Sequence, residues 1–187
     1  MTFEFLNQNS NVLNFTQLAE IHKSELGHVG INLPKKVLSF VYRLLLNKNI
    51  IQILVKFDQA QNVQGFIITQ NKNKILTKLS FQIKYLLFLP LILPFLVVLL
   101  RKFIHDRMLY NRLAYDKKIV VVCVRKKDQR IGIGKLLMNY LMEGIDQDNL
   151  VVLDTKIDNF NAISFYEKLN FKKLKQNKNN IVFGLRK

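Results

Sequence analysis

Cysteine is almost absent from this sequence, which has Cys123 alone among its 187 residues. One thiol excludes an internal disulfide and is compatible with a reducing compartment. The N-terminus, MTFEFLNQNSN, lacks the basic region and the apolar run of a secretory signal, so we expect none. No cluster of His, Cys and Asp residues has the spacing of metal ligands, and we therefore predict no metal site.

Acidic residues are also scarce, with 13 Asp and Glu against 29 Lys and Arg, which gives a formal net charge of +16. Such a chain is expected to be drawn to polyanions: nucleic acid, anionic lipid or phosphorylated small molecules. Nucleic acid is the least favoured of these, because the basic residues are spread out and no recognition helix or aromatic-basic pattern is present. The 49% of apolar residues predicts a single domain over residues 1–187 with a sizeable core.

No apolar run reaches the length that a membrane-spanning helix requires. The longest, residues 85–100 (YLLFLPLILPFLVVLL), has 16 residues without a charge, against roughly 20 needed to span a bilayer, and two prolines interrupt it. Both flanks are basic, so the positive-inside rule gives no orientation. Three interpretations of this apolar helical insertion, residues 71–116, stay open. It packs on the domain or in a homodimer, it lies on an anionic membrane surface through residues 72–112, or it spans the membrane.

The first 70 residues predict a strand, a pair of helices and a hairpin. The expected elements are a strand over residues 2–6, helices over residues 15–26 and 35–46, and strands over residues 50–57 and 63–69. Asn14 is placed to cap the first helix, and Pro34 precedes the second. Gly65, inside a strand, indicates a bulge or a close backbone approach.

The residues after the insertion alternate between strands and helices. The expected elements are strands over residues 118–124 and 149–156, helices over residues 134–145 and 160–169, and hairpin strands over residues 171–175 and 181–185. Asp158 and Asn159 offer caps for the last helix. This alternation predicts an α/β fold with a mixed, partly parallel central sheet and helices on its faces.

A basic turn that contains Gly132 and Gly134 joins the strand over residues 118–124 to the helix that follows it. Backbone N–H groups without helical partners meet the positive end of the helix dipole there, which suits a phosphate group. The glycine spacing and the single mixed sheet argue against a Rossmann or a P-loop site.

Two motifs resemble those of the GNAT-type N-acetyltransferases. The first is QRIGIG, residues 129–134, which matches Q/R-x-x-G-x-G/A between a strand and a helix. The second is NFNAISFYEKLNF, residues 159–171. It resembles the later family motif N-x-x-A-x-x-F-Y-x-x-x-G-F at Asn161, Ala162, Phe165, Tyr166 and Phe171. The resemblance covers residues 117–187 well and residues 14–70 by the order of elements.

Two residues depart from the family pattern, and the insertion is longer than the usual connection. Arg130 stands where the family often has an extra glycine, and Asn170 replaces the glycine before Phe171. Asn tolerates a left-handed backbone, so the second change looks conservative. The apolar, basic insertion resembles that of a bacterial acetyltransferase subgroup often found with cell-surface polysaccharide genes.

The resemblance implies how acetyl-CoA would bind. The strand before the turn would splay from its neighbour and leave a gap for pantetheine, which bonds backbone groups of Val122, Cys123 and Val124. N–H groups of the turn would hold the pyrophosphate, and these belong to Gln129, Arg130, Ile131, Gly132, Ile133 and Gly134. Further charge near the adenosine phosphates, or else a solvated basic face, comes from Arg125, Lys126, Lys127 and Lys135. Asn161 would bond the cofactor or brace the splayed strand.

The resemblance also places Tyr166 near the thioester sulfur, where it would protonate the leaving thiolate as a general acid. No general base is evident. His28 is the preferred candidate, because the pKa of histidine lies near working pH. The alternatives are His22, Glu25, Asp154, Asp158 and a water chain. Cys123 has no His or acidic neighbour in sequence, so we expect a buried core residue.

The function that this resemblance implies is direct transfer of an acetyl group from acetyl-CoA to a primary amine, on a small molecule or an amino sugar. The alternative is a non-catalytic protein that keeps the fold and binds coenzyme A or associates with a membrane. We expect a cytoplasmic protein, with the inner face of the membrane as a second location.

Overall fold

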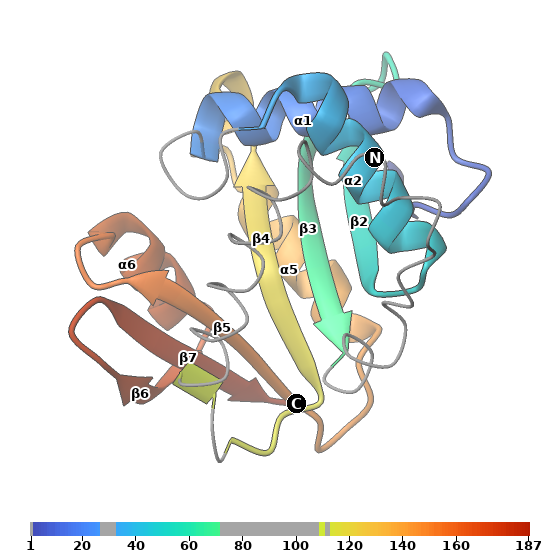
Figure 1. Ribbon diagram of the computed structural model, residues 1–187. Helices are drawn as coiled ribbons and strands as arrows, with labels where there is room; N and C mark the ends of the chain where they lie inside the picture. The colour runs from blue at the N-terminus through green and yellow to red at the C-terminus, as the bar shows by residue number, and fades with distance from the viewer. Residues whose placement is uncertain (1, 27–32, 72–108, 111–112) are drawn as a thin grey trace.

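The computed structural model describes residues 2–26, 33–71, 109–110 and 113–187. These residues build one seven-stranded sheet in the order β1-β2-β3-β4-β5-β7-β6 (Figure 1). The strands are β1 (Thr2–Phe5), β2 (Ile51–Phe57), β3 (Val63–Asn71), β4 (Lys117–Val124), β5 (Leu150–Lys156), β6 (Lys172–Gln176) and β7 (Asn180–Arg186). The β4–β5 pair is parallel and the other pairs are antiparallel, which confirms the predicted mixed sheet.

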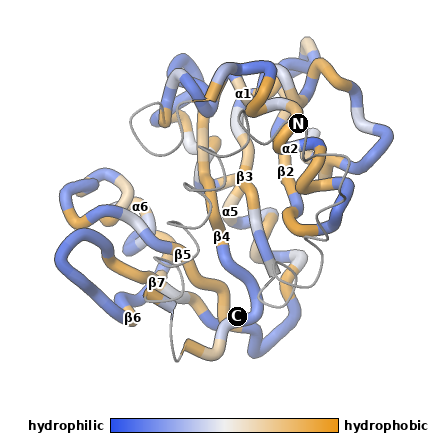
Figure 2. Tube along the Cα trace, in the orientation of Figure 1, coloured by the Kyte–Doolittle hydropathy of each residue, from blue (hydrophilic) through white to orange (hydrophobic). Residues whose placement is uncertain are grey.

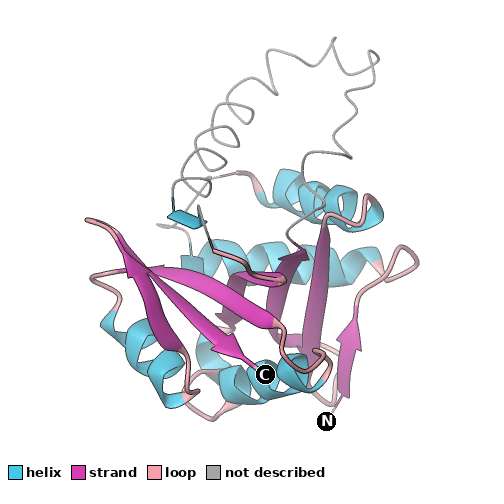
Figure 3. Cartoon of the chain, turned by 90° about the horizontal axis from the view of Figure 1, so that it is seen from below, coloured by secondary structure: helices cyan, strands magenta, loops and turns pink. Residues whose placement is uncertain are grey.

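Helices cover both faces of the sheet, as Figure 3 shows. They are α1 (Val12–Leu26), α2 (Lys35–Asn47), α5 (Ile133–Glu143) and α6 (Phe160–Lys168). The first pair covers a core that includes Phe15, Leu18 and Phe66. The second pair covers a core that includes Leu137 and Phe183. Apolar residues concentrate along the inner strands, whereas the edge strand β6 is polar (Figure 2). The sheet separates two apolar layers.

The start of α1 corrects one prediction. The helix begins at Val12, and the Asn11 side-chain oxygen accepts a hydrogen bond from the N–H of Leu13 at 3.0 Å. Asn14 lies inside the first turn, so the predicted cap at Asn14 is wrong. Asn11 offers the same acceptor three residues earlier, and the helix extends to it.

Gly65 meets both expectations for a glycine inside a strand. Lys56 pairs with Gly65 and Phe57 with Val63, which leaves Gln64 as the extra residue of a β-bulge. A Cβ on Gly65 would lie 2.8 Å from the carbonyl oxygen of Cys123. Only glycine allows β3 and β4 to approach this closely.

The insertion predicted over residues 71–116 falls mainly on residues 72–108 and 111–112, which lie outside the described residues. Near its end, Leu109 and Tyr110 are buried against Val152 and Val182. In the described part of the chain, no helix is long and apolar enough to cross a membrane. The three interpretations of residues 85–100, the homodimer and the single domain stay predictions.

Candidate active site

The strands β4 and β5 pair over a short stretch and then diverge. Their parallel register joins Lys117 to Val151, Lys118 to Val152 and Ile119 to Leu153, with no later pair. On its other side, β4 stays paired with β3 as far as Val124. In the described chain, the edge of β4 toward β5 therefore has no strand partner over residues 120–124, and Figure 1 shows the two strands spreading apart.

A second β-bulge lies where this divergence begins. Ile68 pairs with Val121 and Thr69 pairs with Ile119, so Val120 is the extra residue on β4. A bulge bends its strand and increases its twist. Because Ile119 is also the last residue paired with β5, the bulge gives a physical reason for the divergence.

The turn after β4 exposes a run of backbone donors. A 3-10 turn, η2 (Lys126–Asp128), follows β4, and the first hydrogen bond of α5 joins the N–H of Leu136 to the carbonyl of Gly132 at 3.0 Å. No side chain caps α5. Among the described residues, the N–H groups of residues 130–135 have no acceptor. These donors and the helix dipole together suit an anion.

The two glycines of the turn serve different ends. Gly132 has φ 90°, in the left-handed region that favours glycine, and a Cβ there would meet nothing within 4 Å. Gly134 lies where a Cβ would be 3.3 Å from Cζ of Phe165, so it allows α5 to approach α6. Arg130, with φ 63°, adopts a left-handed backbone where the resemblance expects a glycine.

The basic residues around the turn divide into two sets. The exposed ones are Lys126, Lys127, Arg130 and Lys135. Arg125 instead donates from Nε to Asp128 Oδ2 at 2.5 Å and from Nη2 to Asp58 Oδ2 at 3.3 Å. Burial lowers the pKa of Arg125, but bonding to both carboxylates raises it above its ordinary value overall. The Arg125 guanidinium therefore binds two protein carboxylates, Asp128 in η2 and Asp58 in the loop between β2 and β3.

The C-terminal end of α1 contacts the turn through Gln129. Its Nε2 donates to Glu25 Oε2 at 2.8 Å and to the carbonyl of Val124 at 2.9 Å. His22 is hydrogen-bonded through Nδ1 to the hydroxyl of Tyr42. The preferred base, His28, lies outside the described residues. Of the candidates in this region, the structure brings Glu25 to the turn.

Tyr166 has a buried ring and an available hydroxyl. Its ring packs against those of Phe165, Phe171 and Phe183, with centroids 5.3, 6.1 and 6.0 Å away. None of the hydrogen bonds of the described chain involves its hydroxyl. Burial, and secondly the charge of Asp154, raises the pKa of Tyr166 to about 12. The group is therefore a proton donor throughout the physiological range.

The motif around α6 is anchored by Asn159. The asparagine three residues before Ala162 in the family motif is Asn159, and its side chain accepts from the N–H of Ala162 at 3.2 Å. The predicted cap at Asn159 is thus confirmed. Asn161 is exposed in the first turn of α6, and its role toward the cofactor stays a prediction. Asn170 has φ 65°, which confirms that it takes the left-handed position of the missing glycine.

The remaining candidates differ in how far they are engaged. Asp154 accepts from the hydroxyl of Tyr110 at 2.5 Å and from Asn180 Nδ2 at 3.1 Å, and it lies 3.5 Å from Lys118 Nζ. Asp158 is exposed after β5. Cys123 is 4% exposed, and burial raises the pKa of its thiol to about 12, as expected of a core residue.

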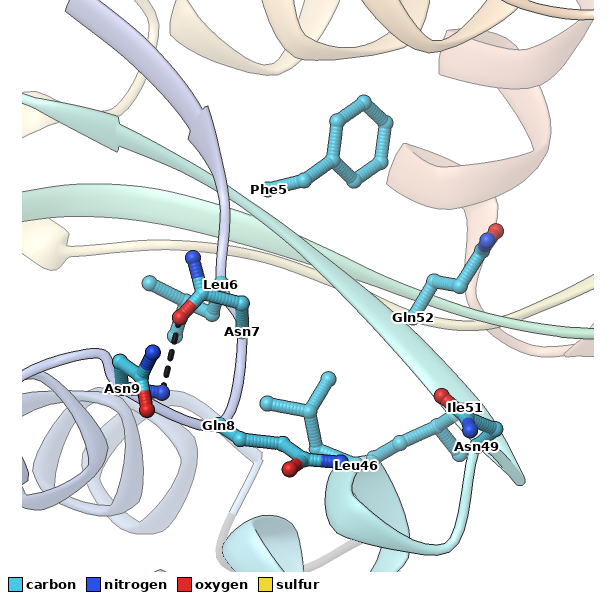
Figure 4. A pocket seen from close by; sticks show the side chains of 9 residues that line it. All are labelled: Phe5, Leu6, Asn7, Gln8, Asn9, Leu46, Asn49, Ile51 and Gln52. Atoms are coloured by element: carbon cyan, nitrogen blue, oxygen red, sulfur yellow. Dashed lines mark hydrogen bonds between the residues drawn. The ribbon is translucent and has the colours of Figure 1, made fainter.

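A cavity of about 470 Å³ lies away from this site. It is lined by residues from the end of β1, the loop that follows, the end of α2 and the start of β2, among them Phe5, Asn9, Leu46 and Gln52 (Figure 4). No residue of the turn or of α6 lines it, so it contributes nothing to the site described above.

Residues 106–180 match the family model of FR47-like proteins. Three solved structures similar in fold are an acetyltransferase from Thermus thermophilus, PaiA N-acetyltransferase from Thermoplasma acidophilum in complex with coenzyme A, and NAA60 from Arabidopsis thaliana in complex with acetyl-CoA. Their identities to this chain are 12%, 13% and 17%, and their TM-scores are 0.64, 0.54 and 0.59. Each comparison covers all of this chain, with 98%, 100% and 100% of the other chain.

None of the curated proteins matches this sequence. The narrower expectation of a surface-polysaccharide subgroup has no support among the matches and stays a prediction. The chain has the fold of the GNAT acetyltransferase superfamily, and residues 106–180 carry an FR47-like sequence pattern.

Proposed function

We propose that this protein transfers an acetyl group from acetyl-CoA to a primary amine. One observation carries the proposal: an unpaired strand edge, residues 120–124, leads directly into a turn whose N–H groups at residues 130–135 lack acceptors in the described chain. An extended amide-containing chain needs the first feature, and a pyrophosphate needs the second. Coenzyme A has both parts, in that order.

The donor would lie along this path. Pantetheine amides would bond backbone groups of Val122, Cys123 and Val124, because an unpaired strand edge alternates donors and acceptors. The pyrophosphate would sit on the N–H groups of the turn, and the exposed Lys135 and Arg130 would add charge beside it. Asn161 is the proposed further contact from α6.

The chemistry requires one proton donor and one proton acceptor. The amine nitrogen forms a bond to the acetyl carbonyl carbon, the carbon–sulfur bond breaks, and the leaving thiolate takes a proton from Tyr166. An amine that binds in its protonated form, R–NH3+, gives one proton to the base before it attacks. It gives a second proton after the carbon–nitrogen bond has formed, which in balance restores Tyr166, and the amide nitrogen keeps the third. His28 stays the proposed base, and Glu25 is the alternative that the structure brings to the turn.

A non-catalytic coenzyme A-binding protein is the second candidate. It is favoured because three of the four described base candidates are engaged: Glu25 with Gln129, His22 with Tyr42, and Asp154 with Lys118 and Tyr110. An amino-sugar or other small acceptor, the polysaccharide subgroup, and attachment to the inner face of a membrane rest on the sequence resemblance and the basic insertion alone.

The test has two stages. Acetyl-CoA is titrated calorimetrically into the protein, and a panel of amines that includes amino sugars is then screened for thiol release. We expect binding and release with at least one amine. Absence of binding at high micromolar acetyl-CoA would reject the family function, whereas binding without turnover on any amine would favour the non-catalytic candidate.

A further inference from the structure

A chain of partly buried polar side chains adjoins the turn at residues 129–134. Lys56, 2% exposed on β2, donates through Nζ to Gln64 Oε1. Gln64 Nε2 donates to Asp128 Oδ1 at 3.3 Å, and Asp128 Oδ2 accepts from Arg125 Nε at 2.5 Å. Arg125 continues to Asp58 Oδ2 at 3.3 Å. Five side chains thus form one continuous connection from β2 through the start of the turn to the β2–β3 loop.

The backbone reinforces this connection at both ends. Gln64 is the bulged residue of β3, and its carbonyl accepts from the N–H of Arg125 at 2.8 Å. Asp58 Oδ1 accepts from the N–H groups of Ala60 and Asn62 at 2.9 and 2.8 Å, which holds the hairpin loop. Hydrogen bonds therefore link the start of the turn to the β2–β3 hairpin, whose loop is itself held by hydrogen bonds.

The charges of the chain balance. Lys56 and Arg125 contribute two positive charges, and Asp128 and Asp58 contribute two negative ones, so the connection adds no net charge to the anion site. Its effect is on the position of the backbone. Asp128, 8% exposed, is the last residue of η2 and directly precedes Gln129, the first residue of the turn.

We propose that Asp128 is a positioning residue that, through Arg125 and Gln64, holds the turn at residues 129–134 in the conformation that binds the pyrophosphate of coenzyme A. This inference rests on the proposed function. It differs from a general contribution to stability in one respect. Loss of Asp128 should weaken the binding of an acetyl donor that carries the pyrophosphate. It should not affect the use of an acetyl donor that ends at pantetheine.

The experiment compares Asp128→Asn with the wild-type protein on two donors. Coenzyme A binding is measured by calorimetry, and kcat/KM for amine acetylation is measured with acetyl-CoA and with S-acetyl-pantetheine. Asp128→Asn keeps the shape of the side chain but removes the charge that Arg125 binds. We expect the Kd for coenzyme A to rise about tenfold, since a buried partner of Arg125 is weakened. kcat/KM should fall similarly with acetyl-CoA and stay unchanged with S-acetyl-pantetheine.

The matched control is Glu167→Gln, which removes one carboxylate charge from an exposed pair with Lys173 at 3.3 Å. It changes the net charge equally and should leave both donors unaffected. Asp58→Asn, at the more exposed end of the connection, is the second variant should Asp128→Asn not fold. It should give a smaller loss confined to acetyl-CoA.

Three results overturn the inference. Equal losses with both donors would assign Asp128 to the shared part of the site or to folding, and unchanged coenzyme A binding would remove any positioning role. A wild-type protein that does not bind coenzyme A would reject the proposed function itself, and the inference with it. If instead the wild type binds coenzyme A and Asp128→Asn binds it equally well, the inference is rejected and the proposed function is not.

Discussion

Tyr166 has a buried aromatic ring and a hydroxyl that takes part in none of the hydrogen bonds of the described residues. Its raised pKa, about 12, means that the phenol keeps its proton at every pH where an amine would be acetylated. A donor of this kind suits a thiolate that leaves as the amide forms.

Replacement of Tyr166 by Phe is expected to slow kcat by about 100-fold, because the proton donor to sulfur is lost while the ring remains. The Kd for acetyl-CoA should stay within a factor of about two, since only a hydroxyl is removed. Steady-state kinetics and calorimetry measure the two effects separately. Tyr140→Phe, at an exposed tyrosine that stacks on Phe3 with centroids 4.6 Å apart, is the control. Unchanged kcat in Tyr166→Phe would remove the general-acid role.

Single glycine and asparagine residues show how much local backbone structure can be predicted from sequence. Gly132, Asn159 and Asn170 could be interpreted because a helix start, a cap and a left-handed turn each depend on one local residue type. The cap predicted at Asn14 was wrong because Asn11, three residues earlier, offers the same chemistry. His28 lies outside the described residues, so the base stays a proposal.

At the scale of elements, the two β-bulges set the shape of the site. The bulge at Gln64 lets β3 carry Gly65 close to β4, and the bulge at Val120 coincides with the divergence of β4 from β5. Both sit within the strand that would receive the donor or beside it. The site therefore depends on irregularities of the sheet as much as on the turn.

Replacement of Gly65 by Val is expected to lower the free energy of unfolding by about 2 kcal/mol, because the added side chain overpacks the core. Its Cβ would meet the Cys123 carbonyl at 2.8 Å and Leu137 Cδ1 at 3.1 Å. Urea denaturation measures this change. Gly144→Ala, whose Cβ would come no closer than 3.7 Å to another residue, is the control and should change little. Equal stability of the two variants would contradict the close approach.

The order and type of the elements could be predicted from sequence, whereas the bracing of the turn could not. Periodic apolar runs and local turn residues predict strands and helices. The bond between Gln64 and Asp128 joins residues 64 positions apart, and that between Arg125 and Asp58 spans 67. Pairings over such distances follow from strand register. The one local signal is a charged residue, Lys56, in a strand whose other residues are uncharged.

At the scale of the whole molecule, burial of ionisable groups links stability to pH. Burial raises the pKa of Cys123 from 9.0 to about 12 and that of Tyr166 from 10.0 to about 12. Burial also raises the pKa of Tyr42. Each group regains its ordinary pKa on unfolding, so the unfolded chain loses protons first as pH rises.

The contribution of these groups to the free energy of unfolding is therefore expected to be complete below about pH 9. It should fall between about pH 9 and pH 12. Urea denaturation at a series of pH values measures the slope. Cys123→Ala removes one of the three groups and should reduce the slope. A midpoint that is constant up to about pH 10.5 would contradict the burial of these groups.

Three residue pairs between β4 and β5 join the two halves of the sheet, β1–β4 and β5–β7. With so few pairs, the sheet is held together most weakly where β4 and β5 diverge. Acetyl-CoA lying along the unpaired edge of β4 would extend the hydrogen bonding past Ile119 and connect the two strands there. Part of the free energy of donor binding would then also stabilise the association of the two halves of the sheet.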